Sequence, residues 1–125
     1  YDVRNRQLHY AGANNSAIIR RENQLIELEP DKMPISIYRD IKEPFTLQTI
    51  EIKPNDILYM YSDGYIDQFG GKKGKKFKSN NFKELLLWLP VNSMEAQGRE
   101  LSEVFDRWRG NLDQVDDVFV LGVKL

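Results

Sequence analysis

The sequence lacks cysteine, has a single histidine and carries almost no net charge. Without cysteine it can form no disulfide framework, no thiolate zinc site and no cysteine nucleophile, a composition that suits a reducing compartment such as the cytoplasm. Its 18 Lys and Arg residues nearly balance its 19 Asp and Glu residues, so the net charge of −1 gives no general case for nucleic-acid binding. The longest apolar runs, Ile57–Tyr61 and Leu85–Leu89, fall far short of the roughly 18 residues that a membrane-spanning helix needs.

The composition that remains is that of a folded domain. Hydrophobic residues make up 41% of the 125 positions and aromatic residues 11%, enough for a sizeable core. The chain starts at Tyr1 instead of Met, and its first three residues already resemble a strand. We therefore expect residues 1–125 to be a piece of a longer protein.

The first half of the chain has the pattern of short strands separated by turns. Leu8–Ala11 leads into the turn-prone loop Gly12–Asn15. Ala17–Arg21 and Gln24–Leu28 flank the pair Glu22-Asn23, which is the spacing of a two-residue hairpin.

The middle and the end of the chain are expected to add further strands. Three prolines between Pro30 and Pro44 indicate an irregular surface connection, and the partly alternating Phe45–Ile52 favours a strand near a sheet edge. The continuous apolar runs Ile57–Tyr61 and Val118–Val123 predict strands covered on both faces.

Two amphipathic helices are predicted between these apolar runs. The first has an apolar stripe ending at Leu89, cap candidates Asn80 and Asn81, and a stop at Pro90. Its stripe consists of Phe82, Leu85, Leu86 and Leu89. The second repeats this spacing with Leu101, Val104, Phe105 and Trp108.

The ends of the second helix are also marked. Asn92 followed by Glu95 resembles a capping box, and Gly110 stands where a helix-ending glycine belongs. Both helices therefore have sequence signals for where they start and stop.

Acidic residues flank both apolar runs at one end. Asp63-Gly64 directly follows Ile57–Tyr61 and Ser62, and Asp116-Asp117 directly precedes Val118–Val123. Each pair alone is typical of an ordinary turn or solvated loop end. If the two strands are antiparallel neighbours, however, the end of one meets the start of the other, and the carboxylates share one rim. Because close carboxylates repel unless a cation lies between them, this arrangement predicts a Mg²⁺ or Mn²⁺ site.

Two other features are weaker candidates. The five lysines of Lys72–Lys78 are interpreted as a solvated loop, with a phosphate or acidic-partner contact as the alternative. The glycine spacing of Gly70–Lys75 is one residue short of a phosphate-binding loop. His9 lies within an expected strand, where a structural role is favoured over a catalytic one.

In their order along the chain, these features resemble the C-terminal half of the SpoIIE-like phosphatase domain. That domain is a bacterial branch of the metal-dependent (PPM, or type 2C) Ser/Thr protein phosphatases. The similar segments are Leu8–Ser16, Met33–Ile37, Ile52–Gly64, Phe69–Gly71 with Lys75–Phe77, and Gly110–Leu112 with Val115–Leu121. Ser36 and Asn55 stand where the family usually has Gly.

The resemblance implies an α+β fold for residues 1–125, namely part of an α-β-β-α sandwich with antiparallel sheets and helices on the outside. It implies a two-metal centre of Mn²⁺ or Mg²⁺ that activates a water to attack phosphoserine or phosphothreonine directly. By position, Asp63 and Asp116 would be metal ligands, and Gly64 would belong to the metal site as the close-approach neighbour of Asp63. Asp117 would contact the ligands instead of the metal.

The family's remaining metal ligands come from an N-terminal half that residues 1–125 do not contain. The resemblance therefore implies that this chain is inactive alone, that its parent acts on a phosphorylated regulatory protein in bacterial signalling, and that a second copy could cover the missing half. The alternative is a catalytically inactive phosphatase-like module for protein interaction or sensor output. Nucleic-acid binding through Lys72–Lys78 is a further alternative and predicts steep salt dependence.

Overall fold

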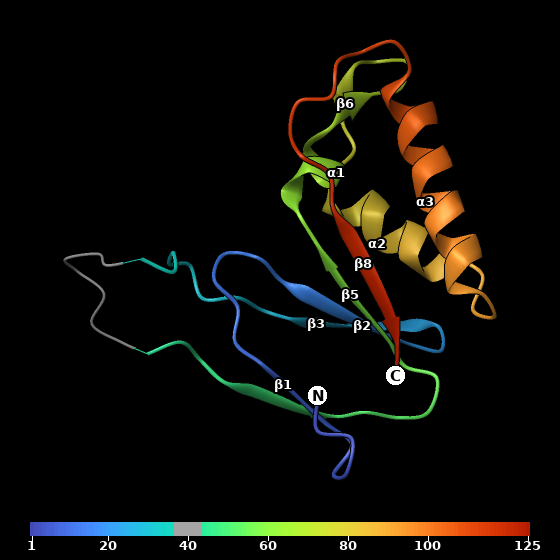
Figure 1. Cartoon of the computed structure of the whole chain (residues 1–125). Helices are drawn as coiled ribbons and strands as arrows, with labels where there is room; N and C mark the ends of the chain where they lie inside the picture. Colours follow the sequence, from blue (N-terminus) through green and yellow to red (C-terminus); the bar gives the residue numbers. More distant parts are fainter. Residues whose placement is uncertain (37–43) are drawn as a thin grey trace.

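The computed structural model describes residues 1–36 and 44–125 (Figure 1). The connection predicted for Pro30–Pro44, and Ile37 of the segment Met33–Ile37, therefore lie partly or wholly outside the described residues. In chain order the elements are β1 (Gln7–Tyr10), β2 (Ala17–Arg21), β3 (Gln24–Leu28), β4 (Gln48–Glu51), β5 (Ile57–Tyr61), α1 (Asp63–Asp67), β6 (Phe69–Gly70), β7 (Lys75–Lys76), α2 (Ser79–Trp88), α3 (Met94–Arg109) and β8 (Val120–Lys124).

The strands form one four-stranded and two two-stranded antiparallel sheets. The larger sheet has the order β3-β2-β5-β8, while β1 pairs with β4 and β6 with β7. The hairpin predicted around Glu22-Asn23 is confirmed, with Arg21 opposite Gln24 and Glu22 at a φ of +53°. The predicted edge strand in Phe45–Ile52 is β4.

Two apolar clusters divide the molecule into three layers (Figure 1). The smaller cluster packs β1 and β4 against one face of the four-stranded sheet and includes Leu8, Ile19 and Ile52. The larger cluster packs α2 and α3 against the other face, with Tyr59 and Phe82 among its fully buried members. A sheet on one side and helices on the other confirm the expected α+β class and part of an α-β-β-α sandwich.

The strand before the C-terminus differs from its prediction. Val118–Val123 was expected to be covered on both faces, but β8 forms the edge of the sheet, and Leu121 and Val123 remain exposed. Ile57–Tyr61 is the strand β5 as predicted, yet Met60 is exposed as well. The apolar pattern identified the strands correctly, but it could not show that one face would lack a cover.

Both helices form where the stripes predicted them, with different N-terminal caps. The residue before α2 is Lys78, in a left-handed conformation with a φ of +74°, and Asn80 and Asn81 lie inside the first turn. The cap of α3 is Ser93, whose Oγ accepts the Ala96 N–H at 3.1 Å, so the predicted Asn92 box is wrong.

The C-terminal end of α2 is held by a buried cation. The Arg20 guanidinium donates to the carbonyls of Leu86, Leu87 and Leu89 at 2.7–2.9 Å. These carbonyls have no partner within the helix and lie at the negative end of its dipole. They therefore compensate the positive charge of Arg20, a residue that is only 5% exposed. This contact fixes α2 to β2.

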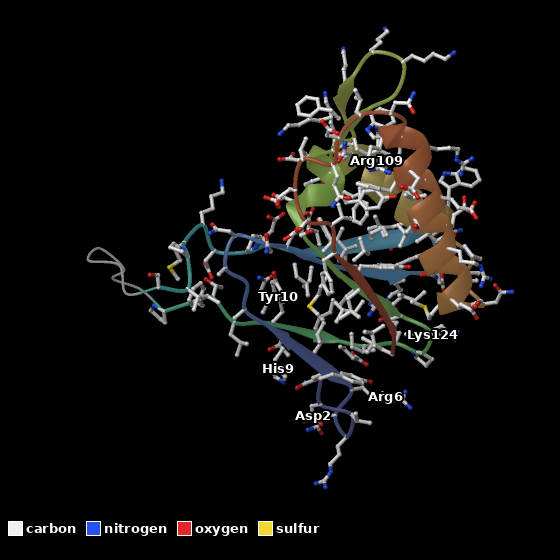
Figure 2. All side chains as sticks on the ribbon, turned by 45° about the horizontal axis from the view of Figure 1, so that its top comes forward. Asp2, Arg6, His9, Tyr10, Arg109 and Lys124 are labelled. Carbon is white, nitrogen blue, oxygen red and sulfur yellow. The ribbon has the colours of Figure 1, made fainter. Side chains whose placement is uncertain are left out.

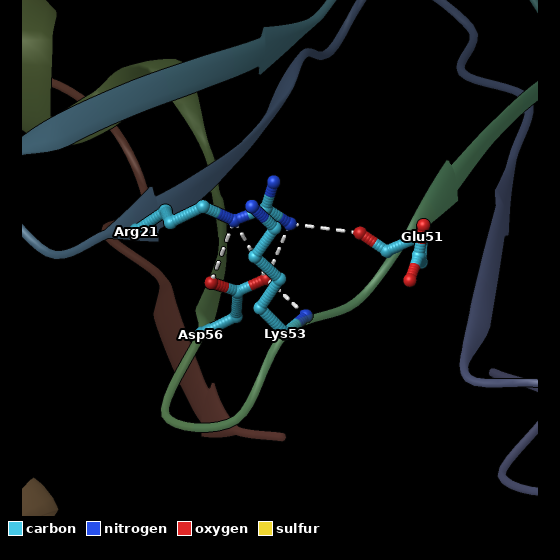
Figure 3. Close-up of polar contacts among 4 residues, drawn as sticks. All are labelled: Arg21, Glu51, Lys53 and Asp56. Carbon is cyan, nitrogen blue, oxygen red and sulfur yellow. Dashed lines mark hydrogen bonds and ion pairs between the residues drawn. The ribbon is translucent and has the colours of Figure 1, made fainter.

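A second arginine forms a buried ion pair at the same end of the sheet (Figure 3). Arg21 Nη2 lies 2.7 Å from Asp56 Oδ2, and its Nε donates to Asp56 Oδ1 at 3.0 Å. Burial alone would raise the pKa of Asp56, but hydrogen bonds from Arg21 and from the Lys53 N–H outweigh it and lower that pKa. The pair ties the turn before β5 to β2, while Arg21 also donates to the Glu51 carbonyl.

Candidate active site at the rim of β5 and β8

The rim predicted from the two apolar runs exists. Strands β5 and β8 are antiparallel neighbours, with Tyr61 at the end of β5 opposite Val120 at the start of β8. The residues after β5, which form α1, and those before β8 therefore lie side by side at the upper end of these two strands in Figure 1. The antiparallel pairing on which the predicted rim depends is thus confirmed.

Ser62 joins the two segments of this rim. Its Oγ donates to the Asp117 carbonyl at 2.8 Å and accepts the Phe119 N–H at 3.0 Å. Its own N–H donates to the Phe119 carbonyl at 3.0 Å. These three hydrogen bonds hold the Asp116-Asp117 loop against the start of α1.

Gly64 is required by the same close approach. A Cβ placed on Gly64 would lie 2.3 Å from the Asp117 carbonyl oxygen and 2.9 Å from its carbon. Backbone atoms cannot rotate away as a flexible side chain can, so no larger residue fits without moving the loop. The group that approaches Gly64 in the structure is the backbone of Asp117.

The three predicted carboxylates differ in their surroundings. Asp63 is the first residue of α1 and is exposed, as are Asp116 and Asp117. Asp116 Oδ1 accepts the N–H of Asp117 at 2.7 Å. Exposed carboxylates are the hard oxygen donors that Mg²⁺ and Mn²⁺ prefer, so they fit a metal in kind. Among residues 1–36 and 44–125, however, no three His, Asp or Glu side chains form a group that could hold a metal ion.

A cleft of about 320 Å³ opens beside Ser62. Its walls come from the loop after β1, the end of β5 and Phe119, and the hydroxyls of Ser16 and Tyr61 lie 3.0 Å apart in it. Tyr10 donates to the Asn15 carbonyl, and burial, together with the neighbouring Tyr61, raises the Tyr10 pKa. Sequence patterns alone do not mark the hydroxyls of Ser16 and Tyr61 as site residues. Ser62 is marked only by its position directly before Asp63-Gly64.

His9 lies outside this site. Figure 2 shows His9 and Tyr10 next to each other on β1, where His9 is exposed and Tyr10 packs against the cluster between the sheets. His9 Nδ1 lies 3.2 Å from Thr49 Oγ1 on the paired strand. This cross-strand contact agrees with the structural role predicted for His9.

The family model described as "Stage II sporulation protein E (SpoIIE)" matches residues 1–125. The chain belongs to the SpoIIE family. The predicted resemblance is thereby confirmed over the whole chain, and it includes both segments of the rim at Asp63 and Asp116.

Solved structures of phosphatase domains share the fold of this SpoIIE-family chain. The SiaA-PP2C domain of Pseudomonas aeruginosa is 25% identical with a TM-score of 0.90, and the match covers 99% of this chain and 48% of that one. The PP2C phosphatase domain with a regulatory fragment of SpoIIE from Bacillus subtilis is 21% identical with a TM-score of 0.77, covering 98% and 35%. A Mn-presoaked structure of the same phosphatase domain is 22% identical with a TM-score of 0.64, covering 95% and 50%.

This SpoIIE-family chain therefore spans about half or less of the solved domains that it matches. No curated protein sequence matches it. No helix in residues 1–36 or 44–125 has the length and hydropathy to cross a membrane.

Proposed function

We propose that residues 1–125 form the C-terminal half of a Mn²⁺- or Mg²⁺-dependent phosphoserine/phosphothreonine phosphatase domain. Its parent protein would act on a phosphorylated regulatory protein in cytoplasmic bacterial signalling. The observation that carries the proposal is the rim at which Ser62 and Gly64 hold the Asp116-Asp117 loop beside Asp63. A phosphatase of this kind needs carboxylates fixed at one end of the sandwich, and this rim fixes the backbone of two such segments.

In this proposal Asp63 and Asp116 each supply a carboxylate to the metal centre. When bound, the metal ions would activate a water for in-line attack on phosphorus. Gly64 allows Asp117 to come close, and Ser62 fixes the distance between the two acidic segments through its three hydrogen bonds. Asp117 contributes its backbone carbonyl as the acceptor of one of these hydrogen bonds.

The remaining ligands would come from the other half of the domain. Support comes from an uncovered apolar face on β5 and β8, the same face that β1 and β4 cover elsewhere on the sheet. Its residues are Met60 (38% exposed), Phe119 (54%), Leu121 (38%) and Val123 (37%). Exposed apolar patches of this kind mark surfaces that another segment or chain covers. We propose that the N-terminal half of the domain covers it, with a second copy of this chain as the alternative cover.

Activity in the full-length parent protein tests the metal-ligand assignment. Asp63→Asn and Asp116→Asn should each abolish Mn²⁺-dependent release of phosphate from a phosphoserine peptide while circular dichroism stays unchanged. Asp113→Asn, a change to an exposed acid in the same loop, is the matched control and should retain activity. If either predicted ligand variant keeps its activity, that residue does not belong to the metal site.

The isolated chain provides the second test. Purified 1–125 should show no Mn²⁺-dependent hydrolysis of the same peptide, because the proposal places part of the metal centre elsewhere. If the isolated chain hydrolyses the peptide in a Mn²⁺-dependent way, residues 1–125 contain a complete site and this part of the proposal is wrong. If the parent protein is also inactive with Mn²⁺ and with Mg²⁺, the catalytically inactive interaction module becomes the better description.

A further inference from the structure

The lysine-rich segment Lys72–Lys78 lies on a hairpin whose base is fixed in place. Strands β6 and β7 pair with Phe69 opposite Lys76, and the turn between them runs from Gly71 to Gly74. Five lysines and no acid occupy positions 72–78. Of these, Lys76 pairs with Asp67 at 3.0 Å.

The base of the hairpin is fastened to the end of α3. The Gly71 N–H donates to the Trp108 carbonyl at 2.8 Å, and a Cβ on Gly70 would lie 2.0 Å from that carbonyl oxygen. The Trp108 indole donates to the Gln68 carbonyl at 3.0 Å, and its ring packs edge-on against Phe77. The hairpin therefore has a defined position relative to α3.

This arrangement creates a cleft of about 550 Å³ between the hairpin turn and the C-terminal end of α3. Lys72 lines it on the hairpin side, and Arg107 and Arg109 line it on the helix side. Figure 2 places Arg109 near the hairpin end of the molecule, well away from Lys124, and Asp2 at the opposite end. Residues far apart in sequence thus bring cations to one cleft.

The charges around the cleft are poorly compensated. Lys72, Lys73 and Lys75 are exposed and form no ion pair with residues 1–36 or 44–125. Arg107 lies 3.8 Å from Glu100 in an exposed pair that contributes little. The two arginines offset the negative dipole end of α3, so the charge of the three lysines remains uncompensated.

Arg109 adds a second guanidinium to this cleft. Its Nη2 pairs with Asp106 at 3.3 Å, whereas its Nε is buried and has no hydrogen-bond partner. Among the side chains that the structure describes, this Nε is the one buried polar atom that forms no hydrogen bond. Because this Nε is closed to solvent, Arg109 contributes to the cleft through the charge of its guanidinium and not through a free Nε–H donor.

We propose that this cleft binds an acidic segment of a partner protein. A short acidic peptide fits better than a nucleic acid because the basic surface is small and borders the exposed acids Glu103 and Asp106 on α3. A phosphate backbone that extended along the helix would meet the repulsion of those acids, whereas a short peptide could stay within the basic cleft. The loop from Gly110 to Asp117 begins at this cleft and ends at the rim, so it connects the two places along the chain.

Fluorescence anisotropy of a fluorescein-labelled hexaglutamate peptide with the 125-residue chain tests this binding at low and moderate salt. Replacing Lys72, Lys73 and Lys75 together by Ala should weaken binding about tenfold. The matched control replaces Lys32, Lys53 and Lys124, three exposed lysines outside the hairpin that carries Lys72. It should leave affinity within about twofold of the unchanged chain after the same loss of charge. Arg109→Ala should weaken binding several-fold, with thermal unfolding used to verify that each variant folds.

Three outcomes would overturn the proposal. Hexaglutamate could fail to bind, both triple variants could weaken it equally, or a six-residue oligothymidine could bind in preference to it. No phosphatase assay is involved, so the result is independent of the metal site proposed at Asp63 and Asp116.

Discussion

Gly64→Ala is the sharpest test of the rim, because the contact it disturbs is entirely backbone. The added Cβ would lie 2.3 Å from the Asp117 carbonyl oxygen, whereas a carbon and a carbonyl oxygen normally stay about 3.3 Å or more apart. The loop must therefore shift by about 1 Å, which strains or breaks the Ser62 hydrogen bonds to Asp117 and Phe119. Overpacking costs about 1–3 kcal/mol and a lost hydrogen bond about 1 kcal/mol, so we expect a destabilisation of about 3 kcal/mol.

Urea unfolding of the 125-residue chain measures that loss, and hydrogen exchange locates it. The Phe119 amide, which donates to Ser62, should exchange at least about tenfold faster in the variant. Gly98→Ala is the control, since a Cβ there meets no atom within 4 Å and the residue lies inside α3. That change should stabilise the chain by about 0.5–1 kcal/mol. If Gly64→Ala unfolds at the same urea concentration as the original chain and the Phe119 amide keeps its protection, the close-packed rim is wrong.

Three further predictions concern the framework away from the rim. Arg21→Ala should destabilise the chain by about 3 kcal/mol in urea unfolding, because it leaves the Asp56 carboxylate, 1% exposed, without its cation. Because the pKa of Asp56 is lowered in the folded state, its carboxylate stabilises the fold above the unfolded-state pKa, and this contribution disappears as the pH falls through the folded-state pKa. Asp56→Asn should therefore flatten the fall in unfolding free energy with decreasing pH, and an unchanged pH profile of stability would contradict this. Ser93→Ala should cost about 1 kcal/mol in thermal unfolding through loss of the Ala96 cap, and no change would show that the cap is unimportant.

Local sequence patterns predicted the elements well where the cause was local. The hairpin at Glu22-Asn23 follows from the two strands that flank it, and the apolar stripes of α2 and α3 follow from helical spacing. The caps were less predictable because Ser93 and Asn92 are adjacent and chemically similar. The backbone direction entering the helix decides which one caps it, and nothing in the local sequence reports that direction.

The candidate site was predictable in outline because strand pairing is a geometric rule. Once β5 and β8 are antiparallel, Asp63 and Asp116 must flank the same end of the sheet. The role of Ser62 was missed because it depends on a loop more than 50 positions later in the chain. The exposure of β8 was missed for a related reason: an apolar strand has the same sequence whether its cover lies in the same 125 residues or elsewhere.

The carboxylates of Asp63 and Asp116 lie beyond the ends of the two strands that carry the uncovered apolar face. This position connects the incomplete set of proposed metal ligands with the missing cover of that face. Met60 and Leu121 face the side of the sheet that β1 and β4 cover elsewhere, and they lie close to the rim that carries Asp63 and Asp116. A segment that buried Met60 and Leu121 would pass close to that rim, because these paired residues lie next to the last pair of the ladder between β5 and β8. The same segment could therefore place additional carboxylates beside Asp63 and Asp116. If the proposed metal centre exists, burial of the face and completion of that centre should occur together. Met60→Asp should then weaken both at once in the parent protein, while Met33→Asp, outside this face, should leave both intact.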